Sequence, residues 1–454
     1  MYLLNDRNNL IINGREVQLM STQINTQNQT ETSGIRRYIS TVLSALWMGL
    51  GQIVNGQFVK GIAFAIFELA VVYQVYDFFK FSYWGITTLG ETPGEDHSLV
   101  ILIKSIVGII FFLMVLGIYI FNLFDAYKNG KKRDMQKEVP GFKKTVKNVF
   151  KHGYSLLYLS PGMIVMLMVT VVPLLFTALI AFTNYDLYHS PPGHVLEWVG
   201  LRNFKMLWTF GSWKRTFFQV FSWTIVWTVI STLSCWILGL VIALVLNQKD
   251  VKFKKMWRTL LILPWAVPFI CSILIWSGLF NTNFGAINEL LGMVGIAGIR
   301  WLEDPFWAKV AIIIVNLWLG FPFQMALATG ILQSIPQDIY EAAVVDGANA
   351  VQKFFKITLP LVLYSMAPLL IMQFAFNFNN FNVIYLFNQG NPPVLGLKAG
   401  GTDILISWIF KLTTDRLKFN YAAALSVIIF IIVATVSIYN FRKTRSFNDE
   451  NIMK

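Results

Sequence analysis

The chain is organised around the polar stretch Ser334-Ile335-Pro336-Gln337-Asp338-Ile339-Tyr340-Glu341-Ala342-Ala343-Val344-Val345-Asp346-Gly347-Ala348, which continues to Ile357-Thr358-Leu359-Pro360. This stretch lies between two long apolar segments. Ser334 can cap a helix in which Pro336 stands early, at a position where no backbone donor is needed. The acidic side chains of Asp338 and Glu341 then lie near the positive end of that helix.

The second half of the stretch predicts a turn and a second helix. Gly347 can supply the turn, Asn349 can cap a second short helix, and Pro360 opens the next apolar segment. Two short helices at right angles, held between membrane spans, would form a knob that protrudes from the membrane. The sequence therefore predicts that residues 334–360 form a helical loop outside the lipid.

The composition of the whole chain is that of an integral membrane protein. Hydrophobic residues make up 55% and charged residues only 13%, with a formal net charge of +13. The basic residues cluster in short loops beside apolar spans, as the positive-inside rule expects, so a nucleic-acid partner is excluded. Cys235 and Cys271 both lie inside apolar runs and are expected to be small buried side chains, not a disulfide pair.

Residues 39–123 are predicted to form an N-terminal module. Its first part, residues 39–61, is short and broken by glycines, so we expect an interfacial or re-entrant helix, with a ninth span as the alternative. Spans are expected at about 62–79 and 101–123. Glu68 stands inside the first of them, where a carboxylate needs a partner. A structural pairing within the N-terminal helices is favoured over a proton site.

The remainder of the chain is predicted to be a basic linker at 124–156 and a membrane core at 157–442. The core carries six spans, at about 157–182, 217–246, 259–280, 309–331, 361–386 and 420–441. Residues 1–38, in which Met20 is a second candidate start, are predicted to be a disordered cytoplasmic N-terminus, and residues 443–454 a cytoplasmic tail. The expected fold is an all-α polytopic membrane protein with about eight transmembrane helices and both termini in the cytoplasm.

The sequence contains no pattern for catalysis or metal binding. A Walker A motif and a Gly-x-Ser-x-Gly elbow are both absent, and the four histidines have neither metal nor triad spacing. An enzyme is therefore excluded, no cofactor is expected on this chain, and the energy for any transport must come from another chain. The last six spans also lack Asp, Glu, Lys and Arg in their interiors, which disfavours an ion-coupled carrier.

Neutral polar residues do occur in these spans, next to aromatic ones. Asn316 precedes Trp318, and Gln373, Phe376, Asn377 and Asn380 occur together, with the last three expected on one helix face with Gln373. Amides beside an apolar ring suit a sugar, because its hydroxyls form hydrogen bonds and its C–H face stacks on the ring. Interhelical packing by asparagine explains the same residues equally well.

The polar stretch resembles the EAA loop of ABC importer permeases, in which E-A-A, three residues, Gly, nine residues and I-x-L-P follow one another. The resemblance implies the core of six spans of the type I (MetI-like) permease fold. It also implies that the loop is the coupling helix held in a cleft of a cytoplasmic ATPase. The residues that it assigns to this coupling are Glu341, Ala342, Ala343, Asp346, Gly347, Ile357, Leu359 and Pro360.

From about Leu263 onward the chain is similar to the maltose/maltodextrin permease subunit of the MalF type. The matching segments are Leu263–Pro268, Ile314–Gly320, the EAA loop and Phe374–Phe381. By position, the resemblance implies that a sugar in mid-membrane contacts Trp265, Asn316, Leu319, Gly320, Phe376, Asn377 and Asn380. It further implies a bacterial plasma-membrane complex with a second EAA-loop permease (MalG type), a homodimeric ATPase (MalK type) that binds ATP and Mg, and maltose or maltodextrin as substrate.

The chain departs from the enteric members of that family in several places. Trp265 and Phe323 stand where those members have tyrosine, and Gln373 stands at a serine position, so the preferred glucan length is open. The connection at about 183–217 is too short to hold a folded external domain. These features suggest a Gram-positive type of protein with an extracellular sugar-binding lipoprotein. A permease for another oligosaccharide, such as a raffinose-type sugar, and an ion-coupled sugar carrier are the alternatives.

Overall fold

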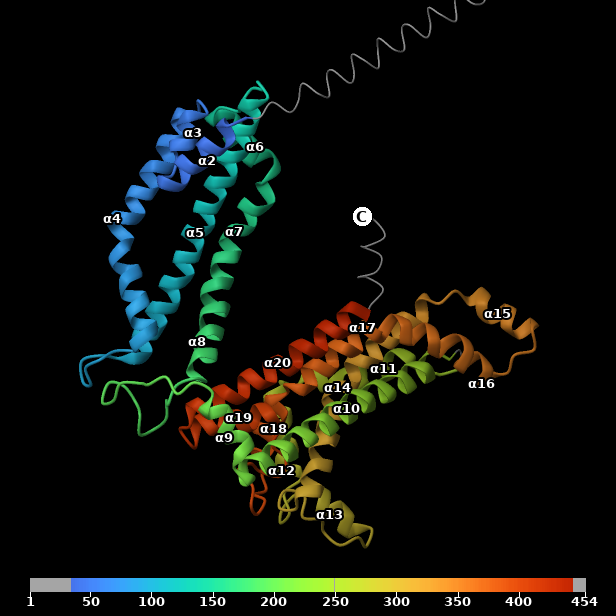
Figure 1. Ribbon diagram of the computed structural model, residues 1–454. Coiled ribbons are helices and arrows are strands. Elements are labelled where there is room, and N and C mark those ends of the chain that lie inside the picture. The colour runs from blue at the N-terminus through green and yellow to red at the C-terminus, as the bar shows by residue number, and fades with distance from the viewer. Residues whose placement is uncertain (1–33, 249, 444–454) are drawn as a thin grey trace, which may run out of the picture. The chain divides into compact units, whose positions relative to one another are not determined.

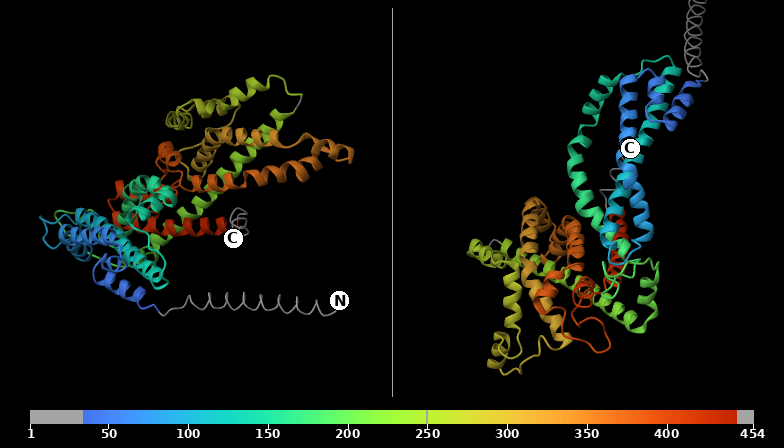
Figure 2. Two further views of the ribbon diagram at one scale, coloured as in Figure 1. Left: turned by 90° about the horizontal axis from the view of Figure 1, so that it is seen from above. Right: turned by 90° about the vertical axis from the view of Figure 1, so that its left-hand side faces the viewer.

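The computed structural model describes residues 34–248 and 250–443, and in this part of the chain every regular element is a helix (Figure 1). The predicted all-α membrane fold is confirmed. The described residues divide into two compact units: residues 34–176 with 189–197, and residues 177–188 with 198–443. The division therefore falls inside the third predicted span, at 176/177. Figure 2 shows the helices of both units from two further directions.

The first unit is built on two long antiparallel helices and several short ones. Its elements are α2 Arg36–Leu46, α3 Leu50–Val54, α4 Phe58–Thr88, α5 Ser98–Asp134, α6 Phe142–His152, α7 Tyr154–Met166, the π-helical turn η1 Leu167–Val171 and the first part of α8 Val172–Ile180. Near the loop that joins them, α4 and α5 approach closely. A Cβ on Gly85 would lie 2.3 Å from the Ser105 hydroxyl oxygen, so a larger residue there would displace the side chain of Ser105.

At the other end of this pair, α2 and α3 pack against α5 and the start of α4 through buried polar groups. Neither α2 nor α3 is long enough to cross a bilayer. Lys60 Nζ lies 2.6 Å from Asp125 Oδ1, and Gln52 Nε2 and Asn129 Nδ2 also donate to the Asp125 carboxylate. Glu68 Oε2 accepts a hydrogen bond of 2.7 Å from the backbone N–H of Met48. Glu68 therefore has a partner within the N-terminal helices.

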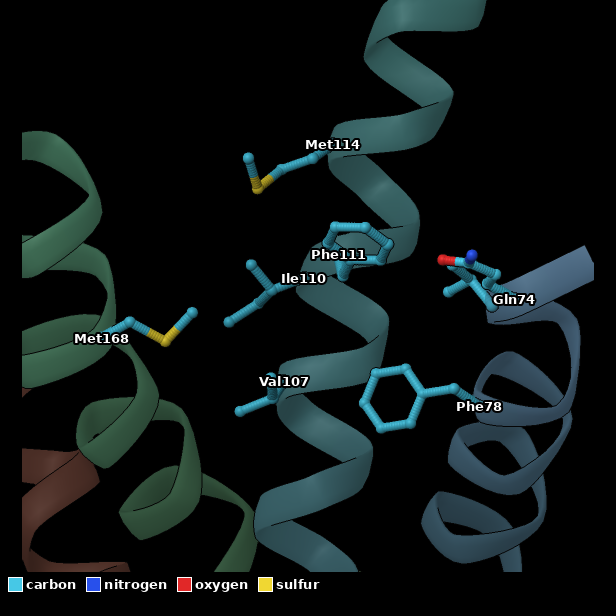
Figure 3. Close-up of a pocket in the computed structure, with 8 residues that line it drawn as sticks. Gln74, Phe78, Val107, Ile110, Phe111, Met114 and Met168 are labelled. Atoms are coloured by element: carbon cyan, nitrogen blue, oxygen red, sulfur yellow. The ribbon is translucent and has the colours of Figure 1, made fainter. Parts of the chain in front are cut away.

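Midway along the first unit, α4, α5 and η1 enclose an apolar groove of about 340 Å3. Figure 3 shows Val107, Ile110 and Met114 of α5 pointing toward Met168 of η1, with Phe78 and Gln74 of α4 on the other side of α5. Gln74 is the only polar side chain among the residues that line this groove. Because the helices around it are membrane spans, lipid chains are the natural filling of such a groove.

The second unit holds the longest helices of the predicted core. Its elements are the end of α8, α9 Arg202–Thr209, α10 Gly211–Asn247, α11 Lys254–Ala266, α12 Phe269–Leu279, α13 Ala286–Met293, α14 Pro305–Ser334, α15 Gln337–Val345, α16 Ala350–Lys353, the π-helical turn η2 Phe354–Thr358, α17 Leu359–Phe378, α18 Phe381–Asn388, α19 Leu405–Thr414 and α20 Phe419–Lys443.

Within the described residues, six helices are long and apolar enough to cross a membrane, or seven if α11 and α12 count as one broken span. With α20 at the position of the last predicted span, all eight predicted segments are helical. The fifth one is not straight, because α11 and α12 meet at 91°. Val267 precedes Pro268, and the proline ring forces the residue before it into extended backbone, which ends α11.

The packing of α10 against α14 forms the centre of the second unit. A Cβ on Gly239 of α10 would lie 2.6 Å from the backbone nitrogen of Met325 in α14, so the two backbones nearly touch there. Cys235, one helical turn earlier, is buried as expected. The expectation for Cys271 was wrong, because its side chain on α12 is exposed in this chain.

Candidate functional site

The predicted sugar-contact region lies where a membrane helix is interrupted. Helix α17 ends at Phe378 and α18 begins at Phe381, with the Asn380 side chain accepting from the backbone N–H of Val383. Asn380 is therefore a cap in the break between two helices. The prediction placed Asn377 and Asn380 on one face of a continuous helix, whereas Asn380 stands outside α17, at the cap of α18.

The amides of this region are buried and bonded to one another across three helices. Asn377 Nδ2 donates to Thr232 Oγ1 of α10 over 3.0 Å, and the Asn377 backbone carbonyl accepts from the Trp227 indole N–H over 3.0 Å. Asn380 Nδ2 donates to Asn316 Oδ1 of α14 over 3.3 Å. In this conformation the three asparagines join α10, α14 and α17.

The predicted contacts on α14 adjoin the same cluster. Asn316 Nδ2 lies 3.8 Å from Cys235 Sγ, and a Cβ on Gly320 would lie 2.7 Å from that sulfur. Leu319 packs instead against a buried apolar cluster that includes Trp227. The structure thus brings Asn316, Gly320 and Asn380 to one place between α10 and the α17–α18 break.

Two aromatic rings of the predicted site are exposed on this chain. Phe376, which precedes the buried Asn377, is 63% exposed, and Trp265 on α11 is 53% exposed. The Trp265 ring lies 5.8 Å from the ring of Phe323 on α14. These rings are free to stack on a ligand or a partner subunit, whereas the amides are covered by their own helices.

Sequence reasoning missed the residues of α10 that complete the cluster, namely Trp227, Thr232 and Cys235. A signal for them was present. Small and polar residues recur on one face of this helix at three- and four-residue spacing, and all of them are buried: Thr224, Thr228, Ser231, Thr232, Cys235 and Gly239. Such a stripe in an apolar span is typical of a helix that packs closely on its neighbours.

The predicted coupling loop forms a short helix, a glycine turn and a capped second helix. Gly347 has φ +77°, a left-handed conformation that favours glycine, and the backbone N–H of Ala348 bonds back to Ala343 over 2.8 Å. Asn349 caps α16, as predicted, and also forms a capping box with Gln352. The Tyr340 hydroxyl lies 2.9 Å from Thr358 Oγ1 and ties α15 to η2.

Two details of the predicted loop were wrong. Ser334 ends α14 and bonds to the Ile331 carbonyl, while Pro336 occupies the cap position of α15 without a side-chain bond. The second helix is also not separate, because residues 350–388 form one candidate span in which a π-helical turn joins α16 to α17. The π-helical turn contains Ile357, and Leu359 and Pro360 begin α17 directly after it.

The surface of the loop is largely unpartnered in this chain. Helices α15 and α16 lie together beyond the ends of α14 and α17 (Figure 1). Glu341, Ala342, Asp346 and Gly347 are exposed, and Ala343 is buried. Val344 and Val345, which are 57% and 87% exposed, add an apolar surface to this end. An apolar surface rimmed by acidic groups is typical of a docking site for another protein.

The predicted outer connection between α18 and α20 contains a second polar cluster. Asp403 is fully buried beside Lys411 Nζ at 2.8 Å, and it also accepts from Ser407 Oγ and the Gly400 N–H. Burial raises the pKa of the Asp403 carboxyl, although Lys411 and the hydrogen bonds oppose that rise. The cluster fixes the loop at 389–403 on α19, which is a structural task.

A bundle of apolar helices with an exposed helical loop and a buried amide cluster is the architecture of a membrane-spanning subunit. Residues 235–444 match the family model described as "Binding-protein-dependent transport system inner membrane component". The chain belongs to this family, because it also aligns with close relatives over almost their whole length. It is the permease component of a binding-protein-dependent ABC importer.

Two relatives from Bacillus subtilis (strain 168) match nearly the whole chain. The galactooligosaccharides transport system permease protein GanP is 44% identical, over 91% of this chain and 99% of its own length. The maltodextrin transport system permease protein MdxF is 41% identical, over 89% of this chain and 95% of its own. A bacterial ABC transporter involved in alginate import shares the fold, with a TM-score of 0.56 at 20% identity over 66% of this chain and 98% of that one.

Family membership shows which subunit of the complex has which function. The permease is not catalytic and binds no cofactor, and ATP is hydrolysed on a partner ATPase. A substrate-binding protein and a second permease complete the assembly in the membrane. The alternative of an ion-coupled carrier that works alone was therefore wrong.

Proposed function

We propose that this chain is the permease of an oligosaccharide importer and that its substrates are maltose and maltodextrins. The observation that carries the proposal is the pairing of exposed rings with amides in spans whose interiors lack charged residues. Phe376 and Trp265 offer ring faces to the C–H face of a sugar. The amides of Asn377, Asn316 and Asn380 lie next to them, bonded to neighbouring helices in this conformation, and would exchange those bonds for sugar hydroxyls when the helices part. The relative named for maltodextrin transport, at 41% identity, supports this substrate class.

Galactooligosaccharides are the second candidate substrate class. The relative named for their transport is 44% identical and aligns over 99% of its length. Both classes are neutral chains of hexoses, so the same rings and amides suit either of them. Gln373 and Phe323, which stand where enteric relatives of the maltose type have hydroxyl side chains, are the positions that we expect to distinguish the two.

The proposed complex places the basic loops in the cytoplasm. We infer that residues 124–156, the coupling loop at 334–360 and both termini face the cytoplasm, where a homodimeric ATPase engages Glu341, Asp346 and Gly347. A sugar-binding lipoprotein would then dock on the outer connections. The charge difference between the two sets of loops supports this orientation.

The test measures uptake in vesicles that contain the full importer with its binding protein. Labelled maltodextrins and galactooligosaccharides are compared in the wild type, and then in Phe376→Ala, Asn377→Ala and Asn380→Ala. If these residues hold sugar, assembly and basal ATP hydrolysis persist while uptake falls by about five- to hundredfold, the equivalent of about 1–3 kcal/mol.

Conservative variants separate sugar binding from helix packing. Phe376→Tyr keeps the ring face and should retain most uptake, whereas Thr232→Val removes the packing partner of Asn377 without touching the exposed ring. If the asparagines only join helices, Asn377→Ala and Thr232→Val should lower the amount of assembled complex equally. Unchanged uptake in all three alanine variants would reject the site.

A further inference from the structure

Helix α6, Phe142–His152, connects two membrane spans without being one. It follows α5, whose apolar part crosses the membrane, and precedes the span Tyr158–Ile180. Eleven residues are too few to cross a bilayer. Because only Gly153 separates α6 from α7, and the span Tyr158–Ile180 begins within α7, α6 is held close to the membrane surface.

The two faces of α6 differ sharply in chemistry. Phe142, Val146 and Phe150 recur at every fourth residue and therefore form one apolar stripe. They are 43%, 36% and 58% exposed, so the folded chain leaves this stripe largely uncovered. The helix has four lysines, none of them in the stripe: they lie along one flank of it and on the opposite face. All four are exposed: Lys143, Lys144, Lys147 and Lys151.

Among the described residues, the lysines of α6 have little acidic charge beside them. The only acidic contact recorded for these lysines, among the residues that the structure describes, is Glu138 at 3.8 Å from Lys144 Nζ. Both side chains of that pair are at least 75% exposed to solvent. Such a pair contributes little, so α6 remains a strongly cationic helix with one apolar face.

We propose that α6 lies in the plane of the membrane and binds the anionic lipid headgroups of the adjacent leaflet. The stripe of Phe142, Val146 and Phe150 enters the boundary of the acyl chains, and the lysines hold the phosphates around it. The last turn of α5, which precedes α6 in the chain, carries three further basic residues, Lys131, Lys132 and Arg133. An anionic lipid surface is the occupant favoured by this combination of a cationic face, an apolar stripe and two membrane anchors.

The binding should be tested with the full importer in vesicles of phosphatidylcholine alone or mixed with phosphatidylglycerol. A fluorophore is attached to Val146→Cys on the stripe or to Lys144→Cys on the opposite face, with Cys271→Ser as background because Cys271 is exposed. Nitroxide groups on the lipid chains should quench the probe at 146 far more than the one at 144. Anionic lipid should strengthen that difference.

Neutralising the lysines tests the electrostatic part of the binding. Lys143→Gln, Lys147→Gln and Lys151→Gln should each lower the ratio of lipid-bound to free α6 by about fivefold in anionic vesicles and much less in neutral ones. Arginine at the same positions should preserve binding. Lys252→Gln with Lys255→Gln, which remove charge from a different loop, serve as the matched control and should not change quenching at 146.

The outcomes that overturn the proposal are distinct. Equal quenching at 144 and 146 would show that α6 does not lie in an anionic surface. The same conclusion would follow if quenching at 146 did not change with the lipid charge or with the lysine substitutions. A probe at 146 shielded from both lipid and aqueous quenchers would show that a protein covers the stripe. Size-exclusion chromatography of each variant confirms that the complex is assembled before quenching is measured.

Discussion

Gly347 is the residue at which the coupling loop depends on one backbone angle. Its φ of +77° is costly for a side chain branched at Cβ, yet a Cβ there would meet no atom within 4 Å. We expect Gly347→Val to abolish uptake by misplacing α15 while membrane insertion persists. Transport assays beside immunodetection in the membrane check this expectation.

The control for Gly347→Val is a second substitution at the same position, where a side chain meets no neighbouring atom within 4 Å. Asparagine adopts the left-handed conformation more easily than other residues, so Gly347→Asn should retain a large part of the activity. Two equally inactive variants would point to contact with the glycine surface and not to its angle. Normal transport by Gly347→Val would exclude a coupling role for the turn.

Asp125 is the second residue with a sharp expected effect. Asp125→Ala would leave Lys60 buried without its anion and should destabilise the first unit by about 3–5 kcal/mol. Limited proteolysis and thermal aggregation of the purified complex measure the loss. The double variant Lys60→Met with Asp125→Leu removes both charges and should recover much of the stability; if it does not, the pair is not the cause.

At the level of single residues, the sequence predicts caps, turns and the need for a hydrogen-bond partner better than it predicts where a helix breaks. The cap at Asn349, the turn at Gly347 and a partner for Glu68 follow from local rules and were found. The break between Phe378 and Phe381 was not foreseen, because a run of Asn and Phe reads equally well as a continuous helix. Whether the amides of that run hold sugar is not a property that local rules can decide.

At the level of elements, the contact between α10 and α14 is set by glycine. A methyl group at Gly239 would lie 2.6 Å from the Met325 nitrogen, so Gly239→Ala must separate two backbones and should cost about 1–3 kcal/mol. The thermal unfolding of the purified complex and the fraction that assembles both report this cost.

The matched control for Gly239 lies on α14 itself. A Cβ on Gly330 would meet nothing within 4 Å, so Gly330→Ala should be neutral or slightly stabilising, because alanine favours helix more than glycine does. If both alanine variants behave alike, close approach of the helices is not what Gly239 provides.

Most helices could be located from hydropathy alone, since long apolar runs have few alternatives in lipid. Their irregularities could not. The bend of 91° at Val267–Pro268 needed the effect of proline on the residue before it. The π-helical turn at Phe354–Thr358 precedes Pro360, which has no N–H and whose ring clashes with the carbonyl group of Lys356 in that turn. The polar stripe on α10, by contrast, is visible in the sequence as a three- and four-residue repeat.

For the whole molecule, the proposed orientation makes a direct prediction. Cysteines at Lys131 and Lys255 should react with an impermeant thiol reagent only after the cells are opened, and one at Glu303 should react in intact cells. All three side chains are exposed. Glu303 is chosen in place of Asp304 because the Asp304 side chain caps α14. Labelling of position 131 from outside would reverse the orientation.

The right-angled break between α11 and α12 has a consequence for hydration. The carbonyl groups that end α11 and the N–H groups that begin α12 have no partners within their own helices, and the break lies in an otherwise apolar span. Hydrocarbon cannot solvate such groups, so water or a neighbouring chain must reach them. Water that reaches these groups would hydrate the membrane interior beside Val267, so the subunit that covers this bend must also seal the resting importer against ions.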